Sequence, residues 1–383
     1  MMSLLPEKHI AVLPFIGASH FQPLVNLVLK LAAAAPRVLF SLLIATGDKH
    51  LLSCSDLPVN VKLYEAISSP WLSPPPGESR KEKMQQFLEG APRTYEMAIA
   101  VAEETAGVKV SCLLTDVFFT FASTLAEKKQ VKWIALWVSS PQVLSAYAYS
   151  DVIIQKFRHD EEARSQPERT LEGIPGLSRM RIKDLPEALQ HTYLDDMYTL
   201  FPVFRELGTV LPRADAILVI SYDEVTPEPL VANLKSKFQE LLVVHLPPGF
   251  EERTRSHGKI VLWAPQNRVL WHRSVGAHVT HGGYNSVFEC VAGEVPMICR
   301  PLWGDNKING VVLEEWGIAV TIDGGTITKD GMLQCLEMVM EGGEVGKTMR
   351  QKIRDLKVLV MDAAGPNGSA SRYFNKLVDI ISS

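Results

Sequence analysis

A histidine–glycine turn with the sequence HGGYNS occupies residues 281–286, between a short apolar run and a helical pattern. Glycines let a ligand approach the backbone closely, and the first turn of a helix presents free N–H groups that attract anions. The turn therefore suits a phosphate or pyrophosphate. Its residues are His281, Gly282, Gly283, Tyr284, Asn285 and Ser286.

Other side chains near this turn match the remaining parts of a sugar nucleotide. Trp263 offers a flat face for a base, and Glu289 lies one helical turn beyond the glycines, where a carboxylate can accept hydrogen bonds from ribose hydroxyls. Asp305 and Asn306 offer hydrogen-bonding groups for sugar hydroxyls. The segment 263–306 thus combines candidates for binding a base, a ribose, a diphosphate and a sugar.

His20 and Asp116 form a candidate acid–base pair. Each follows an apolar run of strand length, so both would lie at the carboxyl edge of one parallel sheet, where α/β proteins bind ligands. A histidine near its ordinary pKa can accept a phenolic proton at neutral pH, and a carboxylate behind it stabilises the imidazolium. Taken alone, His20 is more often an ordinary loop histidine and Asp116 a strand-end cap. The segment 263–306 is what favours the catalytic interpretation.

Two other functional classes find little support. His272, His278 and His281 suggest a metal site, but strand alternation places His278 on the opposite face and no carboxylate or cysteine completes a ligand set. We therefore expect no metal. An NAD-linked dehydrogenase is disfavoured because no GxGxxG motif with a downstream acid follows the first strand.

Alternating strand and helix patterns must position these residues. In the first half, strands are expected at 10–15, 38–44, 61–64, 110–114, 133–137 and 216–220, with helices at 23–31, 82–105 and 121–128. In the second half, strands are expected at 260–263, 276–279, 296–300 and 318–322, with helices at 285–291, 306–316, 329–340, 346–360 and 369–381. Strands that are apolar throughout indicate parallel sheets buried on both faces. We place an N-terminal domain at 1–240 and a C-terminal domain at 241–383, with the last helix packing back on the first domain.

The second domain is predicted to be shortened at its start. A nucleotide-binding half normally opens with a strand, a Gly/Ser loop and a helix that binds phosphate. The stretch 221–260 contains instead a helical pattern at 227–242, an apolar run at 243–246 and a Pro-Pro-Gly turn. Loss of the opening strand would expose sheet edges and remove phosphate donors.

Composition and charge exclude several environments and partners. The net charge of −4 and the absence of a Lys/Arg run argue against nucleic acid. Five widely spaced cysteines without a CxxC pair favour a reducing cytosol. No apolar window reaches membrane-spanning length, and the N-terminus lacks the features of a signal peptide. We expect a soluble cytoplasmic protein.

The stretch WAPQNRVLWHRSVGAHVTHGGYNSVFECVAGEVPMICRPLWGDN resembles the signature box of plant secondary-product glycosyltransferases. These family-one enzymes take glucose or a related sugar from UDP, and the match spans the whole box without a gap. The motifs at 299–301 and 174–176, which read Cys-Arg-Pro and Ile-Pro-Gly, are most similar to the flavonoid (anthocyanidin or flavonol) 3-O-glucosyltransferase branch.

The resemblance implies two Rossmann-like, doubly wound α/β domains facing a cleft (GT-B type), acting as a monomer. It implies UDP-glucose or a related UDP-sugar as co-substrate, no cofactor, and inverting transfer to a flavonoid or other phenolic hydroxyl with His20 as base and Asp116 behind it. The implied UDP-sugar contacts are Trp263, Ala264, Gln266, His281, Gly283, Tyr284, Asn285, Ser286, Glu289, Asp305 and Asn306. The implied acceptor contacts are Ser19, Phe118 and Trp303.

Three positions depart from the family pattern. Tyr284 stands where tryptophan is usual and keeps an aromatic surface, while Asn306 replaces the usual glutamine or histidine. Val138 replaces a threonine that contacts the sugar, so that this contact is expected to be lost. Two functional hypotheses follow: an active glycosyltransferase, or a truncated, impaired or inactive relative that only binds acceptor or nucleotide sugar.

Overall fold

The computed structural model describes most of the chain. The described residues are 6–52, 57–68, 80–155, 166–190, 201–238, 241–244, 266–302, 304–322, 327–340 and 343–383. The predicted strand at 260–263 lies outside these ranges, as do Trp263, Ala264 and Trp303.

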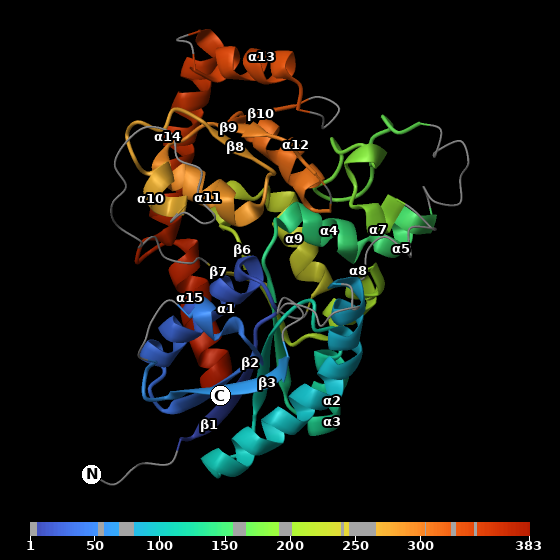
Figure 1. Cartoon of the computed structure of the whole chain (residues 1–383), viewed down its shortest axis with the longest axis vertical. Coiled ribbons are helices and arrows are strands. Elements are labelled where there is room, and N and C mark those ends of the chain that lie inside the picture. The colour runs from blue at the N-terminus through green and yellow to red at the C-terminus, as the bar shows by residue number, and fades with distance from the viewer. Residues whose placement is uncertain are drawn as a thin grey trace.

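A seven-stranded parallel sheet forms the first half of the molecule (Figure 1). Its strands are β1 (Lys8–Leu13), β2 (Val38–Thr46), β3 (Val61–Ser68), β4 (Cys112–Asp116), β5 (Lys132–Trp137), β6 (Ala216–Ile220) and β7 (Leu241–Val244). The strand order is β3-β2-β1-β4-β5-β6-β7. The order reverses direction at β1, so the carboxyl ends of β1 and β4 lie side by side, at the place where open α/β sheets bind ligands.

Helices cover both faces of this sheet. They are α1 (Ala18–Ala34), α2 (Arg80–Ala106), α3 (Ala122–Lys129), α4 (Pro141–Ala148), α5 (Ser150–Ile153), α7 (Glu187–Gln190), α8 (Phe201–Val210) and α9 (Glu228–Lys237), with short 3-10 turns at Asp48–Leu51, Ile182–Asp184, Leu211–Arg213 and Asp223–Val225. Ala11 and Leu13 of β1 enter the core beneath α2, α3, α4 and α8. Ile10 and Val12 enter the core beneath α1. Strands buried on both faces explain the uninterrupted apolar runs in the sequence.

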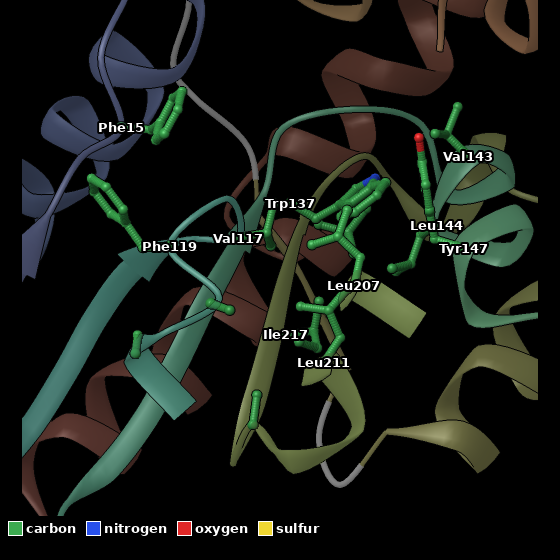
Figure 2. Close-up of a cluster of buried hydrophobic side chains, with 14 of the residues drawn as sticks. Phe15, Val117, Phe119, Trp137, Val143, Leu144, Tyr147, Leu207, Leu211 and Ile217 are labelled. Atoms are coloured by element: carbon green, nitrogen blue, oxygen red, sulfur yellow. The ribbon is translucent and has the colours of Figure 1, made fainter. Parts of the chain in front are cut away.

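The first core extends past the strand ends toward α4 and α8. Figure 2 shows Trp137 of β5, Tyr147 of α4 and Leu207 of α8 packed together in it. The ring centroids of Trp137 and Tyr147 are 5.8 Å apart. This packing fixes α4 at the carboxyl edge of the sheet.

A smaller parallel sheet lies in the second half. Its strands are β8 (His278–Thr280), β9 (Met297–Cys299) and β10 (Ala319–Thr321), in the order β10-β9-β8. The helices are α10 (Gln266–Leu270), α11 (Tyr284–Gly293), α12 (Asn306–Trp316), α13 (Lys329–Met340), α14 (Glu344–Ala364) and α15 (Ser369–Ser382). Within the described ranges β8 pairs with β9 alone, and Val279 on β8 is 46% exposed.

The last helix returns to the first sheet (Figure 1). Leu377 and Ile381 of α15 are buried in the same core as α1. Lys132 donates a hydrogen bond from Nζ to the carbonyl oxygen of Ile380, 3.1 Å away. The end of the chain is therefore an integral part of the N-terminal core.

The α/β fold with parallel sheets is as predicted, and most predicted elements are present with ends shifted by a few residues. The helix predicted at 227–242 is wrong in its second half. It ends at Lys237, and Leu241–Val244 forms β7 in the first sheet. No helix in the described part of the chain is long and apolar enough to cross a bilayer.

Candidate active site

His20 and Asp116 meet at the carboxyl edge of the first sheet. The loop after β1 ends at Gly17, and α1 begins at the next residue. Gly17 has φ of 92°, a conformation that favours glycine. His20 thus lies in the first turn of α1, and Asp116 is the last residue of β4. Nδ1 of His20 lies 2.8 Å from Oδ2 of Asp116. This juxtaposition is the one that the sequence predicted.

The environment of the pair defines the state of the imidazole. The Asp116 side chain is fully buried, and its Oδ1 accepts a hydrogen bond from the backbone N–H of Phe118 at 2.9 Å. Burial disfavours the charged ring, but the charge and hydrogen bond of Asp116, with a further contribution from Asp305, raise the pKa of His20. Because the carboxylate accepts the Nδ1 proton, Nε2 of the neutral ring is left as a proton acceptor.

Aromatic side chains surround the imidazole. The Phe118 ring lies 4.6 Å from the His20 ring between centroids, and the Phe15 ring lies 5.8 Å away, edge-on. Phe204 of α8 packs edge-on against Phe118 at 5.1 Å. The predicted acceptor residue Phe118 therefore belongs to an apolar wall beside the base, which suits a flat aromatic ligand.

The glycine turn lies between β8 and α11. Gly282 has φ of +88°, and a Cβ at this position would lie 2.9 Å from Sγ of Cys299. A Cβ on Gly283 would lie 2.6 Å from Nε2 of His281. Gly282 thus requires glycine, because its positive φ and the nearby Cys299 both disfavour a side chain. The contact at Gly283 is with the tip of the His281 side chain, which can move aside. His281 itself is exposed at the turn.

Asn285 connects this turn to the catalytic pair. Its Nδ2 donates a hydrogen bond to the carbonyl oxygen of Ser19, 3.0 Å away, although the two residues are 266 positions apart. Ser19 immediately precedes His20. The start of α11, which attracts anions, is therefore held against the start of α1, which carries the base.

Gln266 connects Ser286, an expected phosphate contact, to Glu289, the expected ribose contact. Nε2 of Gln266 donates to Oγ of Ser286 and to Oε2 of Glu289, both at 2.7 Å. Burial raises the pKa of Glu289, and the hydrogen bond from Gln266 partly offsets this effect. The three residues, all of them UDP-sugar contacts implied by the family resemblance, therefore lie together.

Asp305 and Asn306 lie where α12 begins. Oγ of Ser139 donates to Oδ2 of Asp305 at 2.6 Å, and Nδ2 of Asn309 approaches the same oxygen at 3.3 Å. Asn306 is only 5% exposed. Ser139 follows β5, so Asp305 reaches the carboxyl edge of the first sheet near His20.

The ring of Tyr284 does not lie with the other predicted donor residues. It is buried, packs against Phe288 at 5.2 Å, and places its hydroxyl 3.4 Å from Oγ of Ser221 at the end of β6. The ring of Tyr284 therefore packs inside the C-terminal core, and its role as a UDP-sugar contact stays a prediction. Its backbone remains in the first turn of α11.

The histidines outside the catalytic pair lie apart. His272 accepts a hydrogen bond at Nδ1 from the backbone of Ser274, 3.2 Å away. Burial, with a contribution from the charge of His281, lowers the pKa of His278 on β8. Among the residues that the structure describes, no three His, Cys, Asp or Glu side chains converge as metal ligands.

Sequence reasoning missed two residues that contact the donor segment. Ser139 adjoins Val138, where a lost sugar contact was expected, and its hydroxyl binds Asp305 instead. Glu187 of α7 accepts a hydrogen bond from the backbone N–H of Gly304 and pairs with Lys307, both at 2.7 Å. Ser139 could have been found from its place after β5, by the same rule that identified Asp116. Glu187 has no such local signal.

Comparisons with known proteins agree with this geometry. Residues 218–356 match the family model described as UDP-glucoronosyl and UDP-glucosyl transferase. The chain is 31% identical to flavonol 3-O-glucosyltransferase of Arabidopsis thaliana, covering 98% of this chain and 97% of that protein. It is also 31% identical to anthocyanidin 3-O-glucosyltransferase of Vitis vinifera, covering 98% of each.

Solved structures give the same result. The fold matches a UDP-glucose: anthocyanidin 3-O-glucosyltransferase in complex with UDP, with a TM-score of 0.88, 29% identity and coverage of 99% of this chain and 100% of the other. Phytolacca americana UGT2 complexed with UDP-2fluoro-glucose and pterostilbene matches with a TM-score of 0.80, 19% identity and coverage of 98% and 100%. These matches support the predicted two-domain GT-B architecture.

The sequence alignment is longer than the chain itself. It runs over 452 positions with the Arabidopsis relative, whereas the chain has 383 residues, and yet it covers almost all of both proteins. The excess of 69 positions (452 against 383) consists of places where the relative has residues and this chain has none. Because both ends are matched, these places are mainly internal.

Proposed function

This chain belongs to the UDP-glucoronosyl and UDP-glucosyl transferase family, and from that premise we propose that it transfers glucose from UDP-glucose to a hydroxyl of a flavonoid-like acceptor, with inversion. The observation that carries this proposal is the contact of Asn285 with the carbonyl of Ser19 beside the His20–Asp116 pair. It brings the expected diphosphate site and the expected base together.

His20 acts as the general base in this proposal. Nε2 accepts the proton of the acceptor hydroxyl while its oxygen attacks the anomeric carbon from the face opposite UDP. The bond between that carbon and the phosphate oxygen breaks, and UDP leaves with the electron pair. Asp116 keeps the proton on Nδ1 beforehand and stabilises the imidazolium afterwards.

The donor is held by the second half of the chain. The N–H groups and dipole of α11 bind the diphosphate, together with His281, Gly283, Asn285 and Ser286. Gln266 and Glu289 bind the ribose, and Asp305 with Asn306 faces the hexose. Trp263 and Ala264 remain the proposed contacts of the base. The UDP-sugar is a co-substrate, and no further cofactor is proposed.

The acceptor binds against the first half. Phe118, with Phe15 and Phe204 around it, forms the wall against which a flavonoid ring would pack. Ser19 and Trp303 are the other proposed acceptor contacts.

We propose that the two domains divide near residue 240, with β7 completing the first sheet just beyond it. We also propose that the protein is a monomer in the cytosol. The four cysteines within the described ranges, Cys112, Cys290, Cys299 and Cys335, are buried free thiols, as suits a reducing compartment.

A turnover assay of the purified chain tests the proposal. UDP release is measured with UDP-glucose, UDP-galactose and UDP-rhamnose in the presence of a flavonol, for the wild type and for His20→Ala. We expect release with UDP-glucose and its abolition by the substitution, whereas release with only UDP-galactose or UDP-rhamnose would refute glucose as the transferred sugar. A wild type without flavonol-dependent release under all these conditions would refute the proposal.

A second function is supported by the internal shortening. The alignment excess of 69 positions (452 against 383) and the exposed Val279 on β8 fit a C-terminal domain that lacks its opening strand, loop and helix. Such a chain would bind acceptor or nucleotide sugar without efficient turnover. Restoring an opening unit from a full-length relative separates the two functions: turnover only in the restored protein, with acceptor binding in both by calorimetry, would establish the second.

A further inference from the structure

We infer that Glu187 is a positioning residue that reaches from the N-terminal half to clamp the turn 304–307 and so aims Asp305 at the transferred sugar. This inference rests on the proposed function, because it assigns a role at the same donor site. The contacts of one carboxylate carry it.

Both oxygens of Glu187 are used by the turn. Oε2 accepts the backbone N–H of Gly304, and Oε1 pairs with Nζ of Lys307, each at 2.7 Å. Gly304 and Lys307 stand immediately on either side of Asp305 and Asn306. The carboxylate therefore fixes both ends of the two-residue segment expected to face the hexose.

The clamp is partly buried. The side chain of Glu187 is 17% exposed and that of Lys307 is 26% exposed, so their attraction is screened less than that of a surface pair. Burial alone would raise the pKa of Glu187, but the hydrogen bonds from Lys307 and Gly304 outweigh it and lower the pKa. Glu187 is thus ionised at neutral pH.

Asp305 is oriented by a second contact from the first half. Ser139 and Asn309 both donate hydrogen bonds to Oδ2 of Asp305. Among the described residues, none donates a hydrogen bond to Oδ1. Oδ2 is therefore held by the protein, and we place the sugar hydroxyl on Oδ1. Glu187 sets the position of the backbone, and Ser139 sets the direction of the side chain.

The contacts made by Glu187 and Ser139 cross between the two halves of the molecule. Glu187 and Ser139 belong to the N-terminal half, whereas Gly304, Asp305 and Lys307 belong to the C-terminal half. The sugar-facing geometry is therefore complete only when the two halves are in contact. UDP binding at α11 does not use these contacts, so the clamp should affect the glycosyl part of the donor and leave the nucleotide part unaffected.

Calorimetry with UDP and with UDP-glucose separates these two parts. The variants are Glu187→Ala, Glu187→Gln, which keeps an acceptor for the Gly304 N–H, and Lys307→Met. The control is Glu127→Gln, which removes an exposed carboxylate paired with Arg213 in the same half. We expect Glu187→Ala to raise the Kd of UDP-glucose about tenfold and to leave the Kd of UDP within about twofold. Glu187→Gln and Lys307→Met should show smaller effects of the same kind, and the control none.

A purely structural role gives a different pattern. The clamp is refuted if Glu187→Ala and Glu187→Gln raise the Kd values of UDP and UDP-glucose equally, or if they change neither Kd. Thermal melting checks that each variant is folded. If Glu187→Ala does not fold, the Kd values of Lys307→Met and Glu187→Gln for UDP and UDP-glucose provide the test.

Binding and turnover of the wild type distinguish failure of the proposed function from failure of the clamp. A wild type that binds UDP-glucose without turnover refutes the transferase activity and leaves the clamp to be judged by the same Kd values. A wild type that does not bind UDP-glucose refutes both. If the wild type is active, Glu187→Ala should also raise the KM of UDP-glucose while the KM of the acceptor is unchanged.

Discussion

The Asn285 side chain of α11 donates a hydrogen bond to the carbonyl oxygen of Ser19, 3.0 Å away, one residue before His20. Two helix starts from opposite halves of the chain therefore meet at one point. One supplies the positive end of a helix dipole, and the other supplies an imidazole held by a carboxylate. Substitutions on each side of this contact should therefore have separable effects on donor binding and on catalysis.

Replacing His20 with alanine should remove the base and leave the donor site intact. We expect kcat to fall by roughly 10²- to 10⁴-fold, the usual contribution of general-base catalysis. The Kd of UDP should be unchanged by calorimetry. The matched control is His272→Ala, since His272 is an exposed histidine outside the site, and it should keep full activity. Equal losses in the two variants would contradict a special role for His20.

Replacing Asp116 with asparagine should change the pH dependence of the reaction. Asp116 helps to raise the pKa of His20 above the ordinary value of 6.5, and catalysis requires the neutral ring, so activity should rise as the pH increases through that raised pKa. The substitution removes the negative charge, and the rising limb of kcat/KM against pH should therefore move to lower pH. The maximal rate should also fall, because an amide stabilises the imidazolium less well. A limb that stays in place would show that another group titrates.

Replacing Asn285 with aspartate tests the anion site at α11. Aspartate keeps the size of the side chain but places a negative charge beside the expected diphosphate, whereas Asn285→Ala only removes the amide. We expect the aspartate variant to weaken UDP more than the alanine variant does, by about tenfold, and most strongly at low salt. Titration of UDP at two salt concentrations measures both effects. Equal weakening by the two substitutions would argue against an anion at this turn.

Replacing Gly282 with alanine should both destabilise the protein and weaken UDP binding. The residue has φ of +88°, and a Cβ would lie 2.9 Å from Sγ of Cys299. Gly107 has φ of +66°, and a Cβ there would meet no atom within 4 Å. Gly107→Ala therefore measures the cost of the strained backbone alone, without a steric clash. We expect about 1 kcal/mol of destabilisation for the control and about 2–4 kcal/mol for Gly282→Ala. Urea denaturation compares them, and equal losses would show that the contact with Cys299 is unimportant.

The sequence was sufficient to predict the residues whose positions follow from parallel-sheet topology. His20 and Asp116 come together because β1 and β4 are neighbours with aligned carboxyl ends. The glycine turn, Ser286 and Glu289 follow from local spacing around α11, whereas Gln266 was expected only from the family resemblance. These features depend on nearby residues or on a rule common to α/β sheets.

Other features depend on contacts that local sequence does not reveal. Glu187 meets Gly304 across 117 positions, and neither residue belongs to a pattern that points to the other. The ring of Tyr284 turns inward because Ser221 and Phe288 surround it. Leu241 and Leu242 continue the apolar spacing of the preceding helix, so the sequence pattern predicts helix where pairing with β6 produces β7.

The return of α15 to the first sheet also affects how the molecule should unfold. Leu377 and Ile381 are buried beside α1, while Ser369 at the other end of the helix donates to Glu224 after β6. Melting of either half would expose apolar surface that the other half helps to bury. Scanning calorimetry should therefore record a single heat-absorption peak for the whole chain.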